Sequence, residues 1–305
     1  MTMPKTDSPF RYPGGKTQLY QFVSNLLNIN KINGTYIEPF AGGAGVAIKL
    51  LLENKVSDIW INDYDKAIYS VWHAILNNPN QLIEKINGVP FDYQNGYTVS
   101  PEESLRYWKH QRKIYLLENN HQNSVELAFS TLFLNRTNVS GIINAGPLGG
   151  FDQSRKTKIY DRFNKQTLID KINCINSKSK HIKLTRLNGL DMLSKINYEI
   201  PSNNCFIFFD PPYYEQGKNL YYSSFNDREH RDLAKQIMKL SNYRWIVTYD
   251  ESPQIFDMYT KNKHNYEYQL RYSANNKKRG KAPEFLFASP SLNIESYDQV
   301  HLQEK

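Results

Sequence analysis

Short apolar runs, separated by turns rich in glycine or polar residues, mark the first part of the chain as a region of alternating strands and helices. Residues 35–40 predict a strand that runs into a turn, and residues 46–53 predict an apolar helix after a Gly-rich segment. A second strand is predicted at 55–62, and Asp63 follows it directly. This order of strand, glycine loop, helix, strand and acid is typical of a parallel α/β sheet.

The same alternation resumes in the second half of the chain. Residues 205–209 form a continuous apolar run, which is typical of a parallel strand that is buried on both faces. Residues 226–240 predict a helix that opens on a capping box formed by Asn226 and Glu229. A further strand is predicted at 244–249.

The middle and the end of the chain depart from this alternation. Helical periodicity dominates the early part of 76–186, and a long irregular part rich in glycine follows it. Near the end, 267–272 and 284–288 predict a pair of antiparallel strands. We therefore predict an α/β fold whose mostly parallel sheet ends in an antiparallel hairpin. Its two segments, 1–75 and 187–305, flank a mainly helical insert at 76–186.

Charge is unevenly distributed along the chain. The 305 residues include 38 Lys and Arg against 30 Asp and Glu, so the net charge is +8. Residues 151–186 hold ten basic and three acidic residues (+7), and residues 260–281 hold seven and one (+6), which leaves −5 for the rest. Two basic segments on a mildly acidic body fit surfaces that grip a polyanion. Most runs of like charge are simply solvated surfaces, so the motifs must show whether these two segments bind a polyanion.

Cysteine content and apolar run length indicate the compartment. Cys174 and Cys205 are the only cysteines, which is too few for a disulfide scaffold or a zinc cluster. The N-terminal residues are polar, and no stretch approaches the roughly 18 apolar residues of a membrane span. We expect a cytoplasmic protein with no membrane segment and no metal site.

The first motif with chemical meaning runs from Glu38 to Gly45, at the turn between the first strand and its helix. Glycines there let the backbone approach a ligand without Cβ clashes. Asp63 lies 18 residues beyond Gly45, and a carboxylate in that place can accept hydrogen bonds from both hydroxyls of a ribose. The alternative for Asp63 is a cap for a helix over 65–76. Together the two features favour a nucleoside cofactor.

The second motif is Asp210-Pro211-Pro212-Tyr213, directly after the apolar strand. Two prolines fix the backbone and remove two N–H donors, which leaves the carbonyl oxygens as acceptors. The Asp210 carboxylate and the Pro211 carbonyl suit the two hydrogens of a planar amino group, and Tyr213 offers a face for its ring. A base taken out of a duplex carries such a group. The alternative is a turn that merely ends the strand.

A third segment, Arg11-Tyr12-Pro13-Gly14-Gly15-Lys16, supplies an aromatic ring, a flexible turn and a cation, and alone it would be an ordinary loop. Taken together, however, the motifs resemble the Dam-type (D12 class) DNA adenine-N6 methyltransferases. The resemblance runs from Arg11 to about Ser289, and the motifs occur in the family's α arrangement. Further matching segments are Leu134-Asn135-Arg136-Thr137, Asp191, His230-Arg-Asp-Leu-Ala234 and Ala282-Pro-Glu-Phe-Leu286.

The resemblance implies a Rossmann-like fold that binds S-adenosylmethionine and carries an inserted target-recognition domain at 76–186. It also implies methyl transfer from that cofactor to the exocyclic amine of a flipped adenine in duplex DNA. The residues it implies for the reaction are Asp210, Pro211, Pro212 and Tyr213. Those it implies for the cofactor are Tyr12, Lys16, Glu38, Phe40, Gly42, Gly43, Gly45, Asp63, Leu190, Asp191 and Asp210. Within this set, Tyr12 and Lys16 would contact the methionine part, Asp63 the ribose, and Leu190 with Asp191 the adenine.

Binding to double-stranded DNA is expected from the insert and from the last hairpin. The residues expected to contact DNA are Asn135, Arg136, Arg155, Lys156, Lys158, Lys277, Lys278 and Arg279. After Arg136 the sequence departs from Dam, because the basic residue that helps to recognise guanine there is absent. The GATC target of Dam therefore does not carry over.

Alternatives remain open at this point. Cytosine-N4 methylation uses the same amine chemistry, although Asp at position 210, rather than Ser, favours adenine. An RNA adenine-N6 methyltransferase and a catalytically silent DNA-binding module are the others. We expect a monomer in solution, associated with the nucleoid of a bacterium or encoded by a phage. Whether it works alone or with a cognate restriction endonuclease is left open by the sequence.

Overall fold

The computed structural model describes residues 6–11, 16–118, 124–215, 225–271 and 281–305. The chain divides into two compact units. Unit 1 consists of the described residues of Lys16–Asp65 and Lys180–Lys305, and unit 2 consists of the described residues of Thr6–Gly15 and Lys66–Ser179. Among the described residues, no helix has the length and apolar character needed to cross a membrane.

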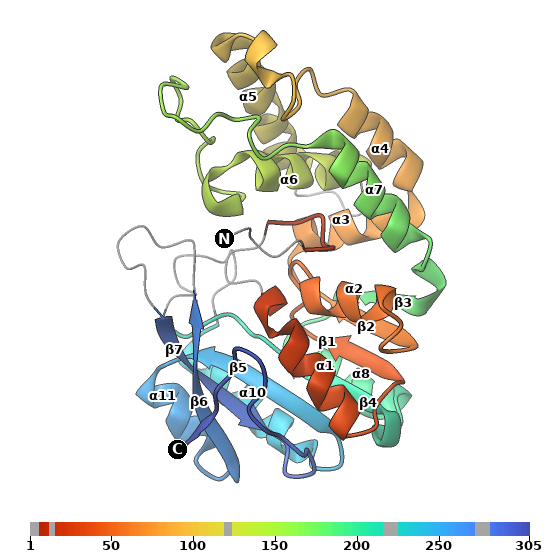
Figure 1. Ribbon diagram of the computed structural model, residues 1–305, viewed down its shortest axis with the longest axis vertical. Helices are drawn as coiled ribbons and strands as arrows, with labels where there is room; N and C mark the ends of the chain where they lie inside the picture. Colours follow the sequence, from red (N-terminus) through yellow and green to blue (C-terminus); the bar gives the residue numbers. More distant parts are fainter. Residues whose placement is uncertain (1–5, 12–15, 119–123, 216–224, 272–280) are drawn as a thin grey trace. The chain divides into compact units, whose positions relative to one another are not determined.

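Unit 1 is built on an eight-stranded sheet with the strand order β3-β2-β1-β4-β5-β7-β6-β8 (Figure 1). Its strands are β1 Thr35–Glu38, β2 Asp58–Asn62, β3 Ile182–Thr185, β4 Cys205–Phe209, β5 Arg244–Asp250, β6 His264–Arg271, β7 Lys281–Ala288 and β8 Gln303–Glu304. Strands β1 to β5 are parallel, whereas β7 is antiparallel to both β5 and β6. The predicted fold, a mostly parallel sheet with a terminal antiparallel hairpin, is confirmed.

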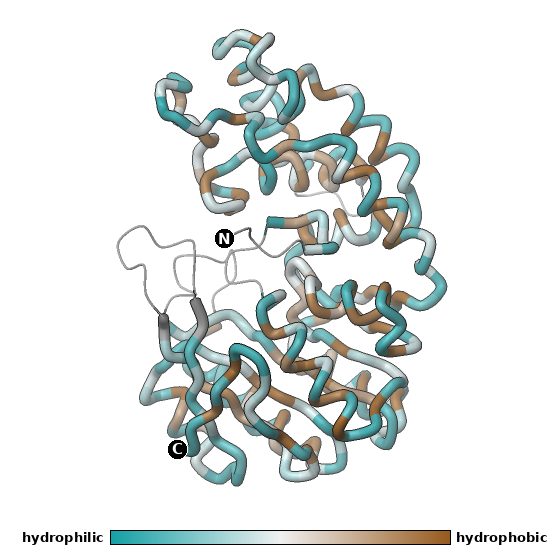
Figure 2. The backbone as a smooth tube through the Cα atoms, in the orientation of Figure 1, coloured by the Kyte–Doolittle hydropathy of each residue, from teal (hydrophilic) through white to brown (hydrophobic). Residues whose placement is uncertain are grey.

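Strand β4 lies at the centre of this sheet because its sequence can be buried on both faces. All five residues of Cys205–Phe209 are buried, as the continuous apolar run predicted. The register places Ile37 of β1 opposite Trp60 of β2 and Ile207 of β4. Figure 2 shows the apolar residues of the strands in brown. Packing in the core therefore fixes the end of β4, which leads directly into Asp210.

Helices pack on the sheet according to their apolar stripes. Those of unit 1 are η1 Lys16–Leu19, α1 Tyr20–Ile29, α2 Gly45–Leu52, α8 Gly189–Glu199, η5 Ser202–Asn204, α10 Asp227–Lys239 and α11 Pro253–Tyr259. Helices α8, α10 and α11 share one core cluster with the sheet, in which Met192, Ile237 and Tyr259 are fully buried. The predicted capping box is confirmed, since Asn226 and Glu229 each accept the other's backbone N–H at the start of α10.

Unit 2 is helical. Its elements are α3 Lys66–Asn77, α4 Pro79–Asn87, η2 Gly96–Thr98, α5 Pro101–Glu118, α6 Val125–Thr137, η3 Val139–Gly141 and α7 Lys165–Asn176, and η4 Ser179–His181 leads out of it. Helix α6 is buried almost all round, and the ring of its Phe133 lies 5.3 Å from Tyr107 and 5.5 Å from Phe163. These rings form the centre of the unit.

The bounds of the two units differ from the predicted division at 75/76 and 186/187. Helix α3 packs on α6 and α7 within unit 2, and β3 extends the sheet of unit 1. Both α7 and β3 lie in the stretch that the sequence predicted as irregular, which is wrong for these residues. The sequence did not predict helix α7 because its apolar face is a single narrow stripe, Leu168, Ile172 and Ile175, in an otherwise polar segment.

Candidate active site

The strand order reverses between β1 and β4, so the loops that follow these two strands diverge. In open α/β sheets, ligands bind outside the carboxyl ends of the strands at such a switch point. The loop after β1 carries the Gly-rich motif, and the loop after β4 carries Asp210 to Tyr213. The topology therefore brings the first two sequence motifs to one edge of the sheet.

Glu38 ends β1 and ties the strand to the following helix. Its Oε1 accepts a hydrogen bond of 3.1 Å from the backbone N–H of Ala47, and burial raises the pKa of the carboxyl to about 8. The turn between strand and helix uses left-handed backbone at Gly42 (φ 48°) and Ala44 (φ 45°). Glycine adopts such a conformation without strain, which explains its presence at position 42.

Asn62 and Asp63 hold the loops at the ends of β1, β2 and β3. The Asn62 amide donates to the carbonyl oxygens of Pro39 and Leu187, at 2.9 Å each, and its Oδ1 accepts from the Leu187 N–H at 2.8 Å. Asp63 accepts from the backbone N–H of Gly42 at 2.7 Å and of Asp65 at 2.9 Å. Both polar side chains thus set the shape of the Gly-rich turn.

The Asp63 carboxylate is only half-buried, so it can also meet a ligand. Burial and the neighbouring charge of Asp65 raise its pKa to about 7. The hydrogen bond from the Asp65 N–H is the one expected if Asp63 caps the helix that follows. It uses only part of the acceptor capacity of the Asp63 carboxylate. Beside it, Tyr64 is 56% exposed, and the guanidinium of Arg186 lies 5.8 Å from its ring centroid.

Helix α8 begins against the same edge. The Asn188 side chain caps it by accepting the Asp191 N–H at 3.0 Å and donating to the Asp191 carboxylate at 2.7 Å. A Cβ at Gly189 would lie 3.0 Å from Phe40, so glycine permits this close approach. Leu190 is 42% exposed at the first turn. Among the predicted cofactor residues, Phe40, Leu190 and Asp191 therefore lie in one region.

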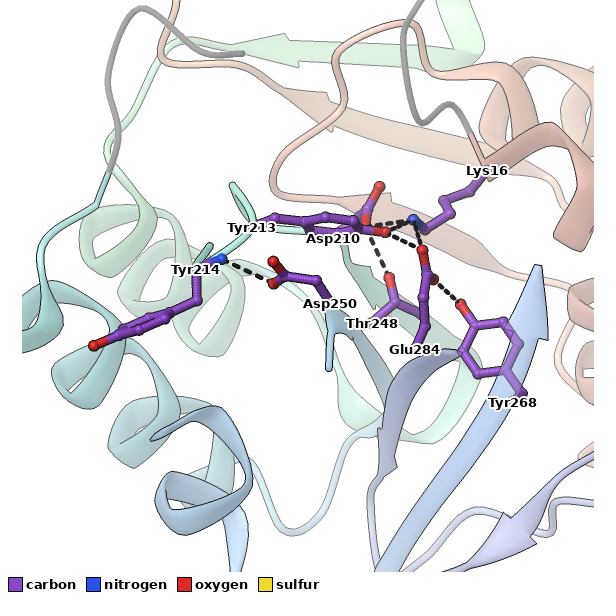
Figure 3. A network of polar contacts seen from close by, with 8 residues as sticks. All are labelled: Lys16, Asp210, Tyr213, Tyr214, Thr248, Asp250, Tyr268 and Glu284. Carbon is purple, nitrogen blue, oxygen red and sulfur yellow. Dashed lines mark hydrogen bonds and ion pairs between the residues drawn. The ribbon is translucent and has the colours of Figure 1, made fainter. Parts of the chain in front are cut away.

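Asp210 follows β4 and lies in the polar network of Figure 3. Its Oδ1 accepts a hydrogen bond of 2.8 Å from the Thr248 hydroxyl and lies 3.4 Å from the Lys16 ammonium. The side chain is 26% exposed. Burial raises the pKa of Asp210, and the Lys16 charge opposes this shift. Asp210 thus presents an oriented carboxylate to a ligand.

Tyr213 is fixed through its hydroxyl group. The hydroxyl donates to Glu284 Oε1 at 2.5 Å and contacts the Lys16 ammonium, which lies 4.6 Å from the ring centroid. Glu284 Oε2 accepts from the Tyr268 hydroxyl at 2.5 Å. Burial raises the pKa of both phenols well above the usual tyrosine value, so they stay neutral donors. Figure 3 shows Lys16, Tyr213 and Tyr268 converging on this one carboxylate.

The backbone after the two prolines is held from β5. The buried carboxylate of Asp250 accepts from the N–H of Tyr214 at 2.9 Å and of Glu215 at 3.0 Å. Thr248 and Asp250 therefore fix both ends of the loop Asp210–Glu215. Sequence reasoning missed both of these residues. A usable signal existed for Glu284, which is a lone carboxylate in the apolar strand β7.

The structure brings Lys16 together with Asp210 and Tyr213, and it places the predicted DNA contacts in two different environments. Asn135 is buried, and its amide bonds the backbone of Arg11 and Gly141, so it supports its loop. Arg136 donates to the Arg162 carbonyl at 2.9 Å. Arg155 and Lys156 are exposed, and Lys158 contacts the Gln153 carbonyl. Tyr12, Lys277, Lys278 and Arg279 lie outside the described residues.

The chain matches a protein family and several known proteins. The family described as D12 class N6 adenine-specific DNA methyltransferase matches residues 12–278. The chain is 26% identical over 245 residues to the type II methyltransferase M.MjaIII of Methanocaldococcus jannaschii, covering 76% of this chain and 80% of that one. It is 22% identical over 288 residues to M1.LlaDCHI of Lactococcus lactis subsp. cremoris, covering 91% and 94% of the two chains.

Two further proteins are similar to the chain. The type II methyltransferase M.CviBI of Paramecium bursaria Chlorella virus NC1A is 25% identical over 269 residues, covering 86% of this chain and 89% of that one. Among solved structures, the rRNA methyltransferase aviRa of Streptomyces viridochromogenes is similar with a TM-score of 0.39 and 11% identity, covering 94% and 88% of the two chains.

Proposed function

We propose roles for the individual residues from one premise: the chain belongs to the D12 class of N6 adenine-specific DNA methyltransferases. It therefore transfers the methyl group of S-adenosylmethionine to the exocyclic amine of adenine in DNA. The alternatives of cytosine-N4 methylation, RNA methylation and a silent binding module are set aside. The chain's own residues would support the reaction in two ways, by holding the cofactor and by orienting the target base.

The residues at the switch point fit the cofactor. The half-buried Asp63 carboxylate suits a ribose diol, and the exposed side chains of Tyr64 and Leu190 offer apolar surface for a purine. The left-handed turn at Gly42 lets the backbone approach a ligand. When bound, S-adenosylmethionine supplies an electrophilic methyl group on a sulfonium.

The observation that carries the site assignment is the oriented carboxylate of Asp210 at the end of β4. The amine of adenine is a poor nucleophile because its lone pair is delocalised into the ring. Hydrogen bonds from its two hydrogens to Asp210 and to the Pro211 carbonyl would draw the nitrogen toward a pyramidal form and direct its lone pair. Positioning and electrostatics then account for most of the catalysis. The Tyr213 ring, which Glu284 and Lys16 hold, would stack on the flipped base.

Replacing Asp210 tests this assignment. We expect Asp210→Ala to lower the rate of methyl transfer from tritium-labelled S-adenosylmethionine by roughly 100-fold or more, because orientation and charge stabilisation are removed together. The matched control is Asp232→Ala, since Asp232 is a half-buried aspartate on α10 that pairs with Arg228 and Lys235. Near wild-type activity of Asp210→Ala would show that the site lies elsewhere.

Replacing Tyr213 separates base binding from cofactor binding. We expect Tyr213→Ala to weaken capture of the target base, measured by the fluorescence of 2-aminopurine placed at that position, which rises when a base is unstacked. Affinity for S-adenosylmethionine, measured by calorimetry, should change little. Equal losses in both measurements would argue against stacking on the base.

We also propose that unit 2, which overlaps most of the predicted insert 76–186, reads double-stranded DNA. Its exposed Arg155 and Lys156 lie in the basic segment 151–186. We also propose a cytoplasmic enzyme that is a monomer in solution. The relatives are type II methyltransferases by name, which favours a role beside a cognate restriction endonuclease. Methylation-aware sequencing of DNA from a methylation-deficient host that expresses this chain would give the target sequence. Size-exclusion chromatography with light scattering would give the oligomeric state.

A further inference from the structure

Two carboxylates share the Lys16 ammonium in unit 1. The Lys16 Nζ lies 3.4 Å from Asp210 Oδ1 and 3.4 Å from Glu284 Oε1. The Lys16 side chain is only 4% exposed, so both carboxylates contribute strongly to the stabilisation of its charge. Any ligand that engages Asp210 must therefore change the balance between the two ion pairs.

The two carboxylates differ in access. The Asp210 side chain is 26% exposed, whereas that of Glu284 is 1% exposed. Glu284 lies in β7 among buried apolar residues, and both of its oxygens accept hydrogen bonds from tyrosine hydroxyls. A base can thus reach Asp210 and cannot reach Glu284.

We propose that Glu284 is a positioning residue that acts through Lys16 and Tyr213. As the constant counter-ion of Lys16, it leaves the ammonium paired when the Asp210 carboxylate turns to the target amine. As the acceptor of the Tyr213 hydroxyl, it holds the ring in place for the base. This inference rests on the proposed roles of Asp210 and Tyr213.

The physical reason is the cost of an unpaired buried charge. Without the Glu284 charge, the Asp210 carboxylate would supply more of the stabilisation of the Lys16 ammonium, so drawing Asp210 toward the target amine would cost more free energy. The target amine would then compete with Lys16 for the same carboxylate. A neutral side chain at position 284 should therefore slow methylation with little change in the fold.

The test uses Glu284→Gln, which keeps the size of the side chain and an acceptor oxygen but removes the charge. We expect kcat to fall by about 10- to 100-fold, as for other hydrogen-bonded charges that position a reacting group. Affinity for S-adenosylmethionine should fall by less than kcat does, because Glu284 pairs with only one of the predicted cofactor residues, Lys16. The matched control is Glu199→Gln, a surface glutamate of α8 that pairs with Lys183 and Lys195.

The pH profile distinguishes this role from a merely structural one. The titratable groups that face Asp210 are Lys16 from η1, Tyr36 and Glu38 from β1, Tyr213 from its own loop, Tyr249 from β5, Tyr268 from β6 and Glu284 from β7. The negative charge of Glu284 raises the pKa of Asp210, so its removal should lower that pKa. The acid limb of the kcat profile should move to lower pH in Glu284→Gln, while the plateau falls.

A double variant shows whether Lys16 transmits the effect. In a Lys16→Met background no ammonium needs a counter-ion, so the cost of Glu284→Gln should shrink to the part that passes through the Tyr213 hydroxyl. An equal loss with and without Lys16, or an unchanged plateau in the single variant, would overturn the inference. Glu284→Asp keeps the charge and should recover part of the rate. If Glu284→Gln fails to fold, the neutral variant Glu284→Met is measured in its place against the same outcomes.

The experiments distinguish a wrong site assignment from a wrong role for Glu284. If Asp210→Ala stays active, the site assignment is wrong. If Asp210→Ala is inactive and Glu284→Gln behaves like wild type, the site assignment stands and only the role of Glu284 is wrong.

Discussion

The Thr248 hydroxyl offers the most direct test of how the fold orients Asp210. Thr248 is fully buried in β5, and its hydroxyl donates a hydrogen bond of 2.8 Å to Asp210 Oδ1. Thr248→Val replaces the hydroxyl by a methyl group of nearly the same size, so the side-chain volume is kept while the hydrogen-bond donor is lost. The variant therefore removes one charge-assisted hydrogen bond and little else.

The size of the effect depends on the kind of bond. A hydrogen bond to a charged group contributes about 1.5–3 kcal/mol, and each ~1.36 kcal/mol is a factor of ten in rate. If the bond serves mainly to orient Asp210, we expect kcat/KM for DNA to fall by roughly 10- to 100-fold. Lys16 remains 3.4 Å from the same oxygen, so the lower half of this range is favoured.

Two measurements check the reasoning. Single-turnover transfer from tritium-labelled S-adenosylmethionine gives the rate, and calorimetry gives the affinity for the cofactor. The hydroxyl stabilises the ionised form of Asp210 and so lowers its pKa; without it, the acid limb of the pH profile should move to higher pH. This shift is opposite in sign to that expected for Glu284→Gln. A rate within twofold of wild type, or a loss confined to cofactor affinity, would refute the orienting role.

Three further predictions concern other parts of the chain. Because Asp63 has a pKa of about 7, affinity for S-adenosylmethionine should rise as pH increases from about 6 to 8, and calorimetry of Asp63→Asn should show no such rise. Burial raises the pKa of Glu38 from the usual 4.5 to about 8, so the unfolded state loses this proton first and stability should fall with rising pH between these values. Urea unfolding of Glu38→Gln should lack this component, which amounts to at most about 1.4 kcal/mol per pH unit. In the basic segment, Arg155→Ala with Lys156→Ala should reduce the salt dependence of DNA binding by a slope of about 0.9 for each phosphate that is no longer neutralised; an unchanged slope in fluorescence anisotropy would place the DNA elsewhere.

The sequence by itself determined the local parts of this protein. The apolar run 205–209 is buried on both faces as β4, and the capping box at Asn226 starts α10, because burial patterns and caps depend on neighbouring residues. The motif Asp210-Pro-Pro-Tyr213 could be assigned to a strand end for the same reason. Helix α7 was not predicted because a narrow apolar stripe in a polar segment is weak evidence for a helix.

Only the tertiary structure decided what surrounds those motifs. Thr248 is 38 residues from Asp210 along the chain, and Glu284 is 71 residues from Tyr213, yet the strand order β4-β5-β7 brings them into hydrogen-bond contact. The partners of an isolated polar residue in an apolar strand cannot be predicted from the residues next to it in sequence. They depend on which strands pair, and strand pairing is a long-range property of the chain. The sequence therefore identified the groups that meet the substrate, and the fold identified the groups that hold them there.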